Sequence, residues 1–97
     1  MESKQTTTIF EVLSPDVHLA LFRLLVKYAL EGLVVGKIAR YLHVTNTKLS
    51  FHLKALLAEL VTMGKEGRFL RYKANISAML DTIAYLTAEY CFRHPER

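Results

Sequence analysis

The chain has 97 residues and a net charge of +4; 52% of the residues are hydrophobic and one is a cysteine. A single cysteine excludes an intramolecular disulfide and fits a reducing cytoplasm, and the length fits one small domain over residues 1–97 with flexible tails at 1–8 and 93–97. So large an apolar fraction exceeds what a core of this size hides easily, which predicts a surface that a partner covers.

Two apolar segments open the chain. The polar start MESKQTTT lacks the apolar core of a secretory signal, and residues 9–13 then predict one or two helical turns. Because Ser14 can cap a helix and Pro15 suits its first turn, we predict a second helix over about residues 15–29. Charged residues within the apolar run 19–33 exclude a membrane span. The core face of this helix is expected to hold Leu19, Phe22, Leu25, Val26 and Ala29.

A short helix, a turn and a longer helix follow. Residues 35–42 predict the short helix, His43 and Val44 form the turn, and Thr45 is expected to be the N-cap of a helix over about residues 45–58. At 100° per residue, three leucines fall within about 40° of Leu49 and form a core stripe with it, namely Leu53, Leu56 and Leu60. The opposite face and its flanks hold Asn46, Thr47, Lys48, Ser50, Phe51, His52 and Lys54.

The last third of the chain predicts a hairpin and a helix. Residues 61–63 and 69–72 alternate like two strands around Gly64 and Gly67. Residues 76–92 repeat apolar side chains at helical spacing, which predicts a terminal amphipathic helix of about four turns. The expected fold is therefore mainly α (α+β), a winged helix-turn-helix with about five helices and a two-stranded β-hairpin wing.

The basic charge gathers in this motif. Residues 37–73 hold eight Lys/Arg and two acids, a net of +6, and the remaining residues hold five and seven, a net of −2, which together give +4. A surface that faces phosphate requires such a concentration, and a helix-turn-helix followed by a wing is a DNA-binding order. We expect Asn46, Thr47, Lys48 and Ser50 nearest the major groove, and Lys54, Lys65, Arg68 and Arg71 mainly on phosphate.

Two residues of the longer helix keep alternative interpretations. His52 either touches a phosphate or a base, or packs under the wing. Phe51 either contacts a thymine methyl group or packs against the wing of a partner.

These motifs resemble those of the ArsR (arsenical resistance repressor) family of winged-helix transcriptional regulators. The resemblance covers about residues 13–92 and rests above all on LSFHLKAL at 49–56 and on the wing KEGRFLRY at 65–72. It implies a homodimer built on the first and last helices, which represses an operator and is usually released by a small effector or metal ion. The expected partners are therefore double-stranded operator DNA and a second copy of the chain, in the cytoplasm and on the nucleoid.

The resemblance also implies a dimer interface. The chain departs from the family pattern at two positions. Its dimer interface corresponds here to Ile9, Leu13, Leu80, Ile83, Leu86 and Tyr90. His18 stands where arginine is common in the family, and Glu59 stands where glycine often precedes the wing. Either Glu59 adopts a left-handed backbone with a strain of about 1 kcal/mol, or the helix runs directly into the strand.

The sequence holds few residues that could bind a metal or metalloid effector. Soft metals and arsenite need two or three thiolates, and residues 38–44 hold no cysteine. The terminal helix lacks the Asp-x-His spacing of the family's zinc sites, so we predict no metal site and no cofactor. Cys91 is either a small apolar interface residue or an effector site that acts with its copy in the dimer or with His94.

Two other classes of function are alternatives to DNA binding. A winged-helix module could bind RNA or a protein partner through the same basic face without sensing an effector. An enzyme is not expected, because Cys91 and His94 form the only nucleophile–base pair in view and have no recognisable acid partner or glycine-rich loop.

Overall fold

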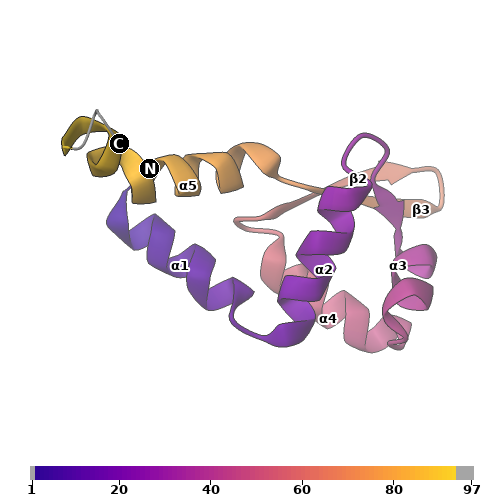
Figure 1. The fold of residues 1–97 in the computed structure, drawn as a ribbon. Coiled ribbons are helices and arrows are strands. Elements are labelled where there is room, and N and C mark those ends of the chain that lie inside the picture. The colour runs from indigo at the N-terminus through magenta and orange to yellow at the C-terminus, as the bar shows by residue number, and fades with distance from the viewer. Residues whose placement is uncertain (1, 94–97) are drawn as a thin grey trace.

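The computed structural model of the protein describes the backbone of residues 2–93 and the side chains of residues 2–90. In this part of the chain there are five helices and a small antiparallel sheet, which confirms the expected winged-helix class (Figure 1). The elements in order are α1 (Ser3–Leu13), α2 (Asp16–Lys27), β1 (Leu33–Val34), α3 (Val35–Leu42), α4 (Asn46–Leu56), β2 (Val61–Glu66), β3 (Phe69–Ala74) and α5 (Ile76–Arg93).

The sheet has a third strand that the sequence did not predict. Its order is β1-β3-β2, and β3 pairs antiparallel with both neighbours, so that Tyr72 lies opposite both Leu33 and Met63. The two-residue strand β1 forms because Gly32 turns the chain onto β3 with a φ of 73°. A Cβ at Gly32 would lie 2.7 Å from the carbonyl oxygen of Tyr72, so only glycine fits there without a shift.

The leucine stripe of α4 is confirmed as the base of the core. Leu49, Leu53, Leu56 and Leu60 all have no exposed surface, and they pack with buried residues of α1, α2, α3, β1, β2 and β3. Beyond Leu56 the chain leaves the helix through a turn over residues 57–60. Within the described residues, His43 is the only non-glycine residue with a positive φ, so Glu59 carries no left-handed strain.

The core face of α2 differs from the expected one. Leu19 and Val26 are 46% and 41% exposed, whereas the buried positions are His18, Leu21, Phe22 and Leu25. These follow the spacing i, i+3, i+4, i+7 of one helical face. The prediction is confirmed at Phe22 and Leu25 and was wrong at Leu19 and Val26, because apolar residues occupy both faces of this helix and hide the period.

The N-terminal segment is more ordered than expected. Helix α1 begins at Ser3, inside the segment 1–8 that the sequence analysis assigned to a tail, and Thr6 and Ile9 are buried. The prediction of Ser14 as an N-cap was also wrong. Ser14 closes α1 through its backbone N–H, which donates to the backbone oxygen of Glu11 at 3.3 Å, and Pro15 precedes α2 without a side-chain cap.

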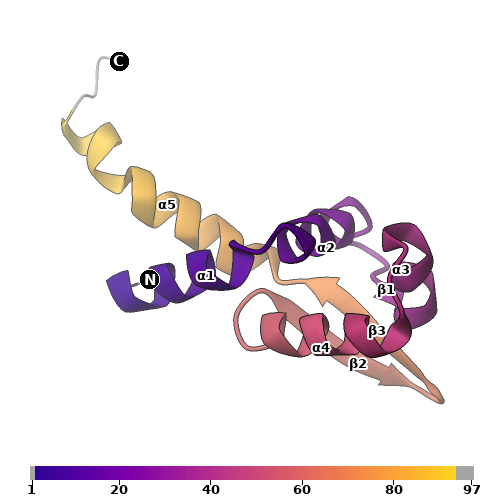
Figure 2. The ribbon, with the colours of Figure 1, turned by 90° about the horizontal axis from the view of Figure 1, so that it is seen from below.

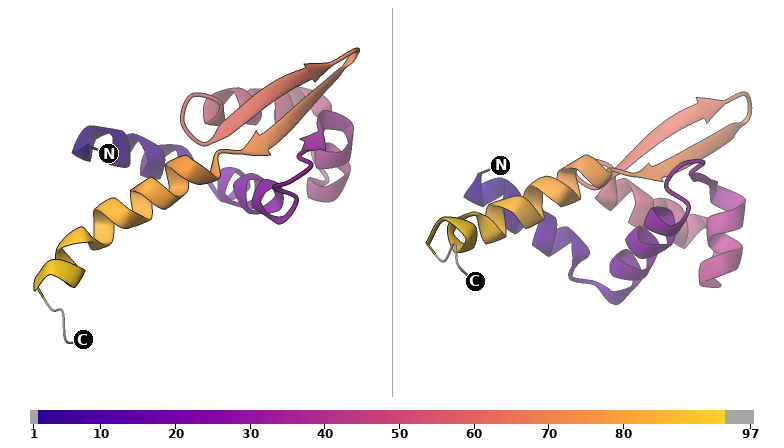
Figure 3. Two further views of the ribbon diagram at one scale, coloured as in Figure 1. Left: turned by 90° about the horizontal axis from the view of Figure 1, so that it is seen from above. Right: turned by 45° about the horizontal axis from the view of Figure 1, so that its top comes forward.

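The molecule is elongated, with extents of 51 × 24 × 20 Å. Helices α1 and α5 lie at the end opposite the wing tip, and α5 projects away from the body (Figures 2 and 3). The helix-turn-helix and the wing therefore occupy the other end of the molecule.

Candidate nucleic-acid interface

The turn between α3 and α4 is fixed by two local features. His43 ends α3 in the left-handed conformation, with a φ of 56°, and its backbone N–H donates to the carbonyl of Ala39. Thr45 then caps α4, because its Oγ1 accepts a hydrogen bond from the backbone N–H of Lys48 at 3.2 Å. The predicted N-cap is confirmed, and the cap sets the direction of the first turn of α4.

The first half of α4 offers a polar surface. Asn46, Thr47, Lys48, Ser50 and Lys54 are all exposed, on a helix whose leucines face the core. Their side chains make no hydrogen bond or ion pair with the rest of the described chain. Phe51 is 74% exposed on the same helix. These groups are free to contact a partner.

His52 is joined to α2 by a hydrogen bond that the sequence did not reveal. Its Nδ1 lies 2.9 Å from Nε2 of His18, and Nδ1 of His18 lies 2.8 Å from the carbonyl oxygen of Val12. The two rings meet edge to face, with centroids 4.9 Å apart. Nε2 of His52 has no partner among the described residues and is not sealed from solvent.

The wing carries two exposed cations near its tip. Lys65 and Arg68 are exposed and flank Gly67, whose φ of 58° makes the turn between β2 and β3. Neither cation has an ion-pair partner in the part of the chain that the structure describes. Both can therefore reach an external anion.

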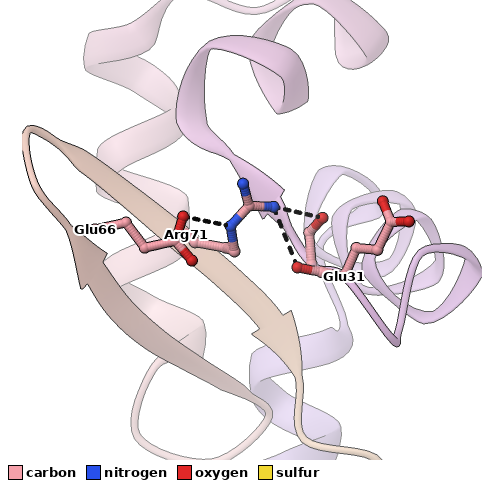
Figure 4. Close-up of polar contacts among 4 residues, drawn as sticks. Glu31, Glu66 and Arg71 are labelled. Carbon is pink, nitrogen blue, oxygen red and sulfur yellow. Dashed lines mark hydrogen bonds and ion pairs between the residues drawn. The ribbon is translucent and has the colours of Figure 1, made fainter.

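Arg71 makes three contacts within the protein (Figure 4). Its Nε lies 3.1 Å from Oε1 of Glu66, and its Nη1 donates to the backbone oxygens of Glu31 and Gly32 at 3.1 and 3.3 Å. The predicted phosphate contact at Arg71 competes with these bonds. The guanidinium instead ties the wing to the turn that leads into β1.

The exposed apolar surface gathers on α5. Leu80, Ile83, Leu86 and Tyr90 are 58%, 49%, 56% and 52% exposed. Of the two interface residues expected in α1, Leu13 is half-buried against the core and Ile9 is only 1% exposed. The assignment of Ile9 to a dimer interface was wrong, because its side chain is already covered within the protomer. Phe10 is the exposed neighbour, at 47%.

The two predicted effector residues lie at the C-terminal end of the chain. The side chain of Cys91 and the whole of His94 lie outside the described residues. Within those residues, no three side chains of His, Cys, Asp or Glu gather as metal ligands. No helix there is long and apolar enough to cross a membrane.

The structure is similar to that of an ArsR-like transcriptional regulator from Rhodococcus sp. RHA1. The TM-score is 0.74 and the sequence identity is 26%, over 93% of this chain and 86% of that one. NolR from Sinorhizobium fredii shares the fold, with a TM-score of 0.68 and 19% identity over 90% of this chain and 85% of NolR. Reduced HlyU from Vibrio cholerae N16961 shares it too, with a TM-score of 0.69 and 21% identity over 91% and 90%.

The resemblance indicated by residues 49–56 and 65–72 is thereby confirmed in three dimensions. No protein-family model matches the chain, and a search of curated proteins found no match.

Proposed function

We propose that this chain is a sequence-specific DNA-binding transcriptional regulator, which acts as a symmetric homodimer and represses an operator until a small effector releases it. The observation that carries the proposal is the exposed, unpaired polar surface of α4 beside a basic wing. The structural similarity to an ArsR-like transcriptional regulator supports it.

Each part of the interface has a proposed role. Asn46, Thr47, Lys48 and Ser50 read base edges, because the first residues of a recognition helix lie deepest in the major groove. Lys54, Lys65 and Arg68 bind phosphate. Arg71 holds the wing in place rather than binding DNA, because its Nε and Nη1 already have acceptors within the protein.

The key experiment measures binding to an operator and to random DNA. Asn46→Ala and Thr47→Ala are each expected to cost about 1–3 kcal/mol on the operator and little on random duplex. Gln5→Ala is the matched control, because Gln5 is exposed on α1, at the end of the molecule away from the wing. Equal losses on both duplexes would assign these residues to the backbone. Tighter binding to RNA than to any duplex would favour the alternative interaction module.

The dimer is proposed to form through α5 together with Phe10 and Leu13 of α1. Leu80 and Leu86 are more than half exposed, so neither is needed for the core of the protomer. Leu80→Glu or Leu86→Glu should therefore give a folded monomer that binds the operator poorly, because a buried unpaired charge opposes association. Sedimentation and circular dichroism test this together. A variant that stays dimeric would place the interface elsewhere.

The effector site is proposed at Cys91, with its copy in the dimer or with His94. Cys91→Ser should leave folding and operator affinity intact while abolishing release by arsenite, zinc or peroxide. Release that is unchanged in this variant would make Cys91 an apolar residue of the interface.

A further inference from the structure

The His18–His52 pair has a fixed hydrogen-bond direction at one end. A carbonyl oxygen only accepts, so Nδ1 of His18, at 2.8 Å from the oxygen of Val12, must carry a proton. The two facing nitrogens, Nε2 of His18 and Nδ1 of His52, lie 2.9 Å apart and must share a single proton. The number of protons on the pair therefore decides what the remaining nitrogen, Nε2 of His52, offers to a ligand.

In the neutral pair, His18 uses its one proton toward Val12, so its Nε2 accepts. His52 must then carry its proton on Nδ1, which leaves Nε2 of His52 as an acceptor. Adding one proton changes this result whichever ring holds the charge. The shared proton occupies the space between the rings, and the other proton of His52 lies on Nε2, which becomes a donor.

We propose that operator binding draws one proton into the His18–His52 pair and thereby turns Nε2 of His52 into a donor to a DNA phosphate. This inference rests on the proposed function. An acceptor nitrogen cannot hydrogen-bond a phosphate oxygen, whereas a donor on a cationic pair binds it well. The negative charge of the duplex also favours the protonated pair.

The surroundings leave the pair free to respond. Neither imidazole takes part in an ion pair within the described residues. The charged side chains nearest to the pair in sequence, on the three elements that meet there, are Glu11 of α1, Asp16 of α2, and Lys48 and Lys54 of α4. A second added proton would put a hydrogen on both facing nitrogens and break the bond between the rings.

The number of protons on the His18–His52 pair determines how operator binding depends on pH. Operator affinity should rise as pH falls, by up to about tenfold per pH unit for each protomer that takes up a proton, or about a hundredfold for the dimer. It should fall again at lower pH, where the second proton separates His52 from His18. His18→Gln should reduce the rise, because a neutral His52 can then carry its proton on Nε2 and donate it to phosphate. It should also lose the low-pH fall, because no second imidazole is left to repel His52.

Calorimetry in buffers of different ionisation enthalpy counts the protons directly. The wild type is expected to take up protons on binding, at most one per protomer, and His52→Gln none, since its amide donates at every pH. His43→Asn is the matched control: it removes an exposed histidine, and asparagine tolerates the left-handed backbone there. Uptake that is absent in the wild type, or unchanged in His52→Gln, would overturn the inference while operator binding stands.

A second measurement needs no DNA. Nitrogen-15 spectra of the free protein at high pH should show both His18 and His52 protonated on Nδ1. A dominant Nε2–H form of either ring would also overturn the inference. Failure of the wild type to bind any duplex sequence-specifically would instead remove the proposed function, and the inference with it.

Discussion

The two surfaces proposed to meet DNA are held to the body in different ways. Helix α4 rests on leucines with no exposed surface, and Thr45 fixes its first turn. In the wing, residues 62–70 are all exposed, and only its base, at Val61 and Tyr72, is buried. The recognition helix is thus positioned by the core itself, whereas the wing depends on Gly32 and on the three contacts of Arg71.

The largest effect should come from the base of α4. Leu53→Ala is expected to lower the free energy of unfolding by about 2–5 kcal/mol, because it opens a cavity in a fully buried site. Phe69→Ala, in the wing, removes a larger side chain that is 63% exposed. It should change the free energy of unfolding by no more than about 0.5 kcal/mol. Denaturant unfolding measures both. Similar losses would show that the wing is also held by packing.

The next largest loss of stability is expected at Gly32, in the turn that leads into β1. Gly32→Ala should cost at least about 1–2 kcal/mol, because alanine is strained at a φ of 73° and its Cβ would press on the backbone of Tyr72. Gly36→Ala is the matched control, since no atom lies within 4 Å of a Cβ at this helical position, and it should stabilise by about 0.5–1 kcal/mol. Thermal unfolding that ranks the two variants alike would exclude a special role for Gly32.

The smallest effect on stability is expected from the loss of Arg71. Its effect on DNA binding is measured with a double-mutant cycle that includes Arg68. The Arg71–Glu66 pair is exposed, so its loss should change the free energy of unfolding by only about 0–1 kcal/mol. Arg68→Ala should reduce the log–log salt slope of operator binding by about 0.9. In an Arg71→Ala background, Arg68→Ala should have little further effect, because the wing is already displaced.

Arg23→Ala is the control for lost charge, since Arg23 is exposed on α2 outside the basic segment. Additive losses for Arg68 and Arg71 would return Arg71 to the phosphate role that the sequence predicted.

The difference between the two surfaces also explains what the sequence could predict. The stripe of α4 was found because its leucines lie on one face only, and Thr45 was found because capping is local. The buried face of α2 was found only in part, because Leu19 and Val26 are as apolar as the buried Leu21. The two backbone partners of Arg71 are 39 and 40 residues away along the chain, and the hydrogen-bond partner of His52 is 34 residues away. Such long-range pairs leave no periodic signal.

One detail of the Arg71 contacts predicts how this surface can vary among related chains. Arg71 binds backbone oxygens at Glu31 and Gly32, and the carboxylate of Glu31 points away from it (Figure 4). Almost any residue at position 31 would offer the same backbone carbonyl group, so we expect the residue type at that position to vary. Position 32 must stay glycine to keep the turn, and position 71 must keep a guanidinium that reaches Glu66 through Nε and both backbone oxygens through Nη1. In an alignment of relatives, positions 32 and 71 should therefore change together or not at all, while position 31 between the helix and the turn varies.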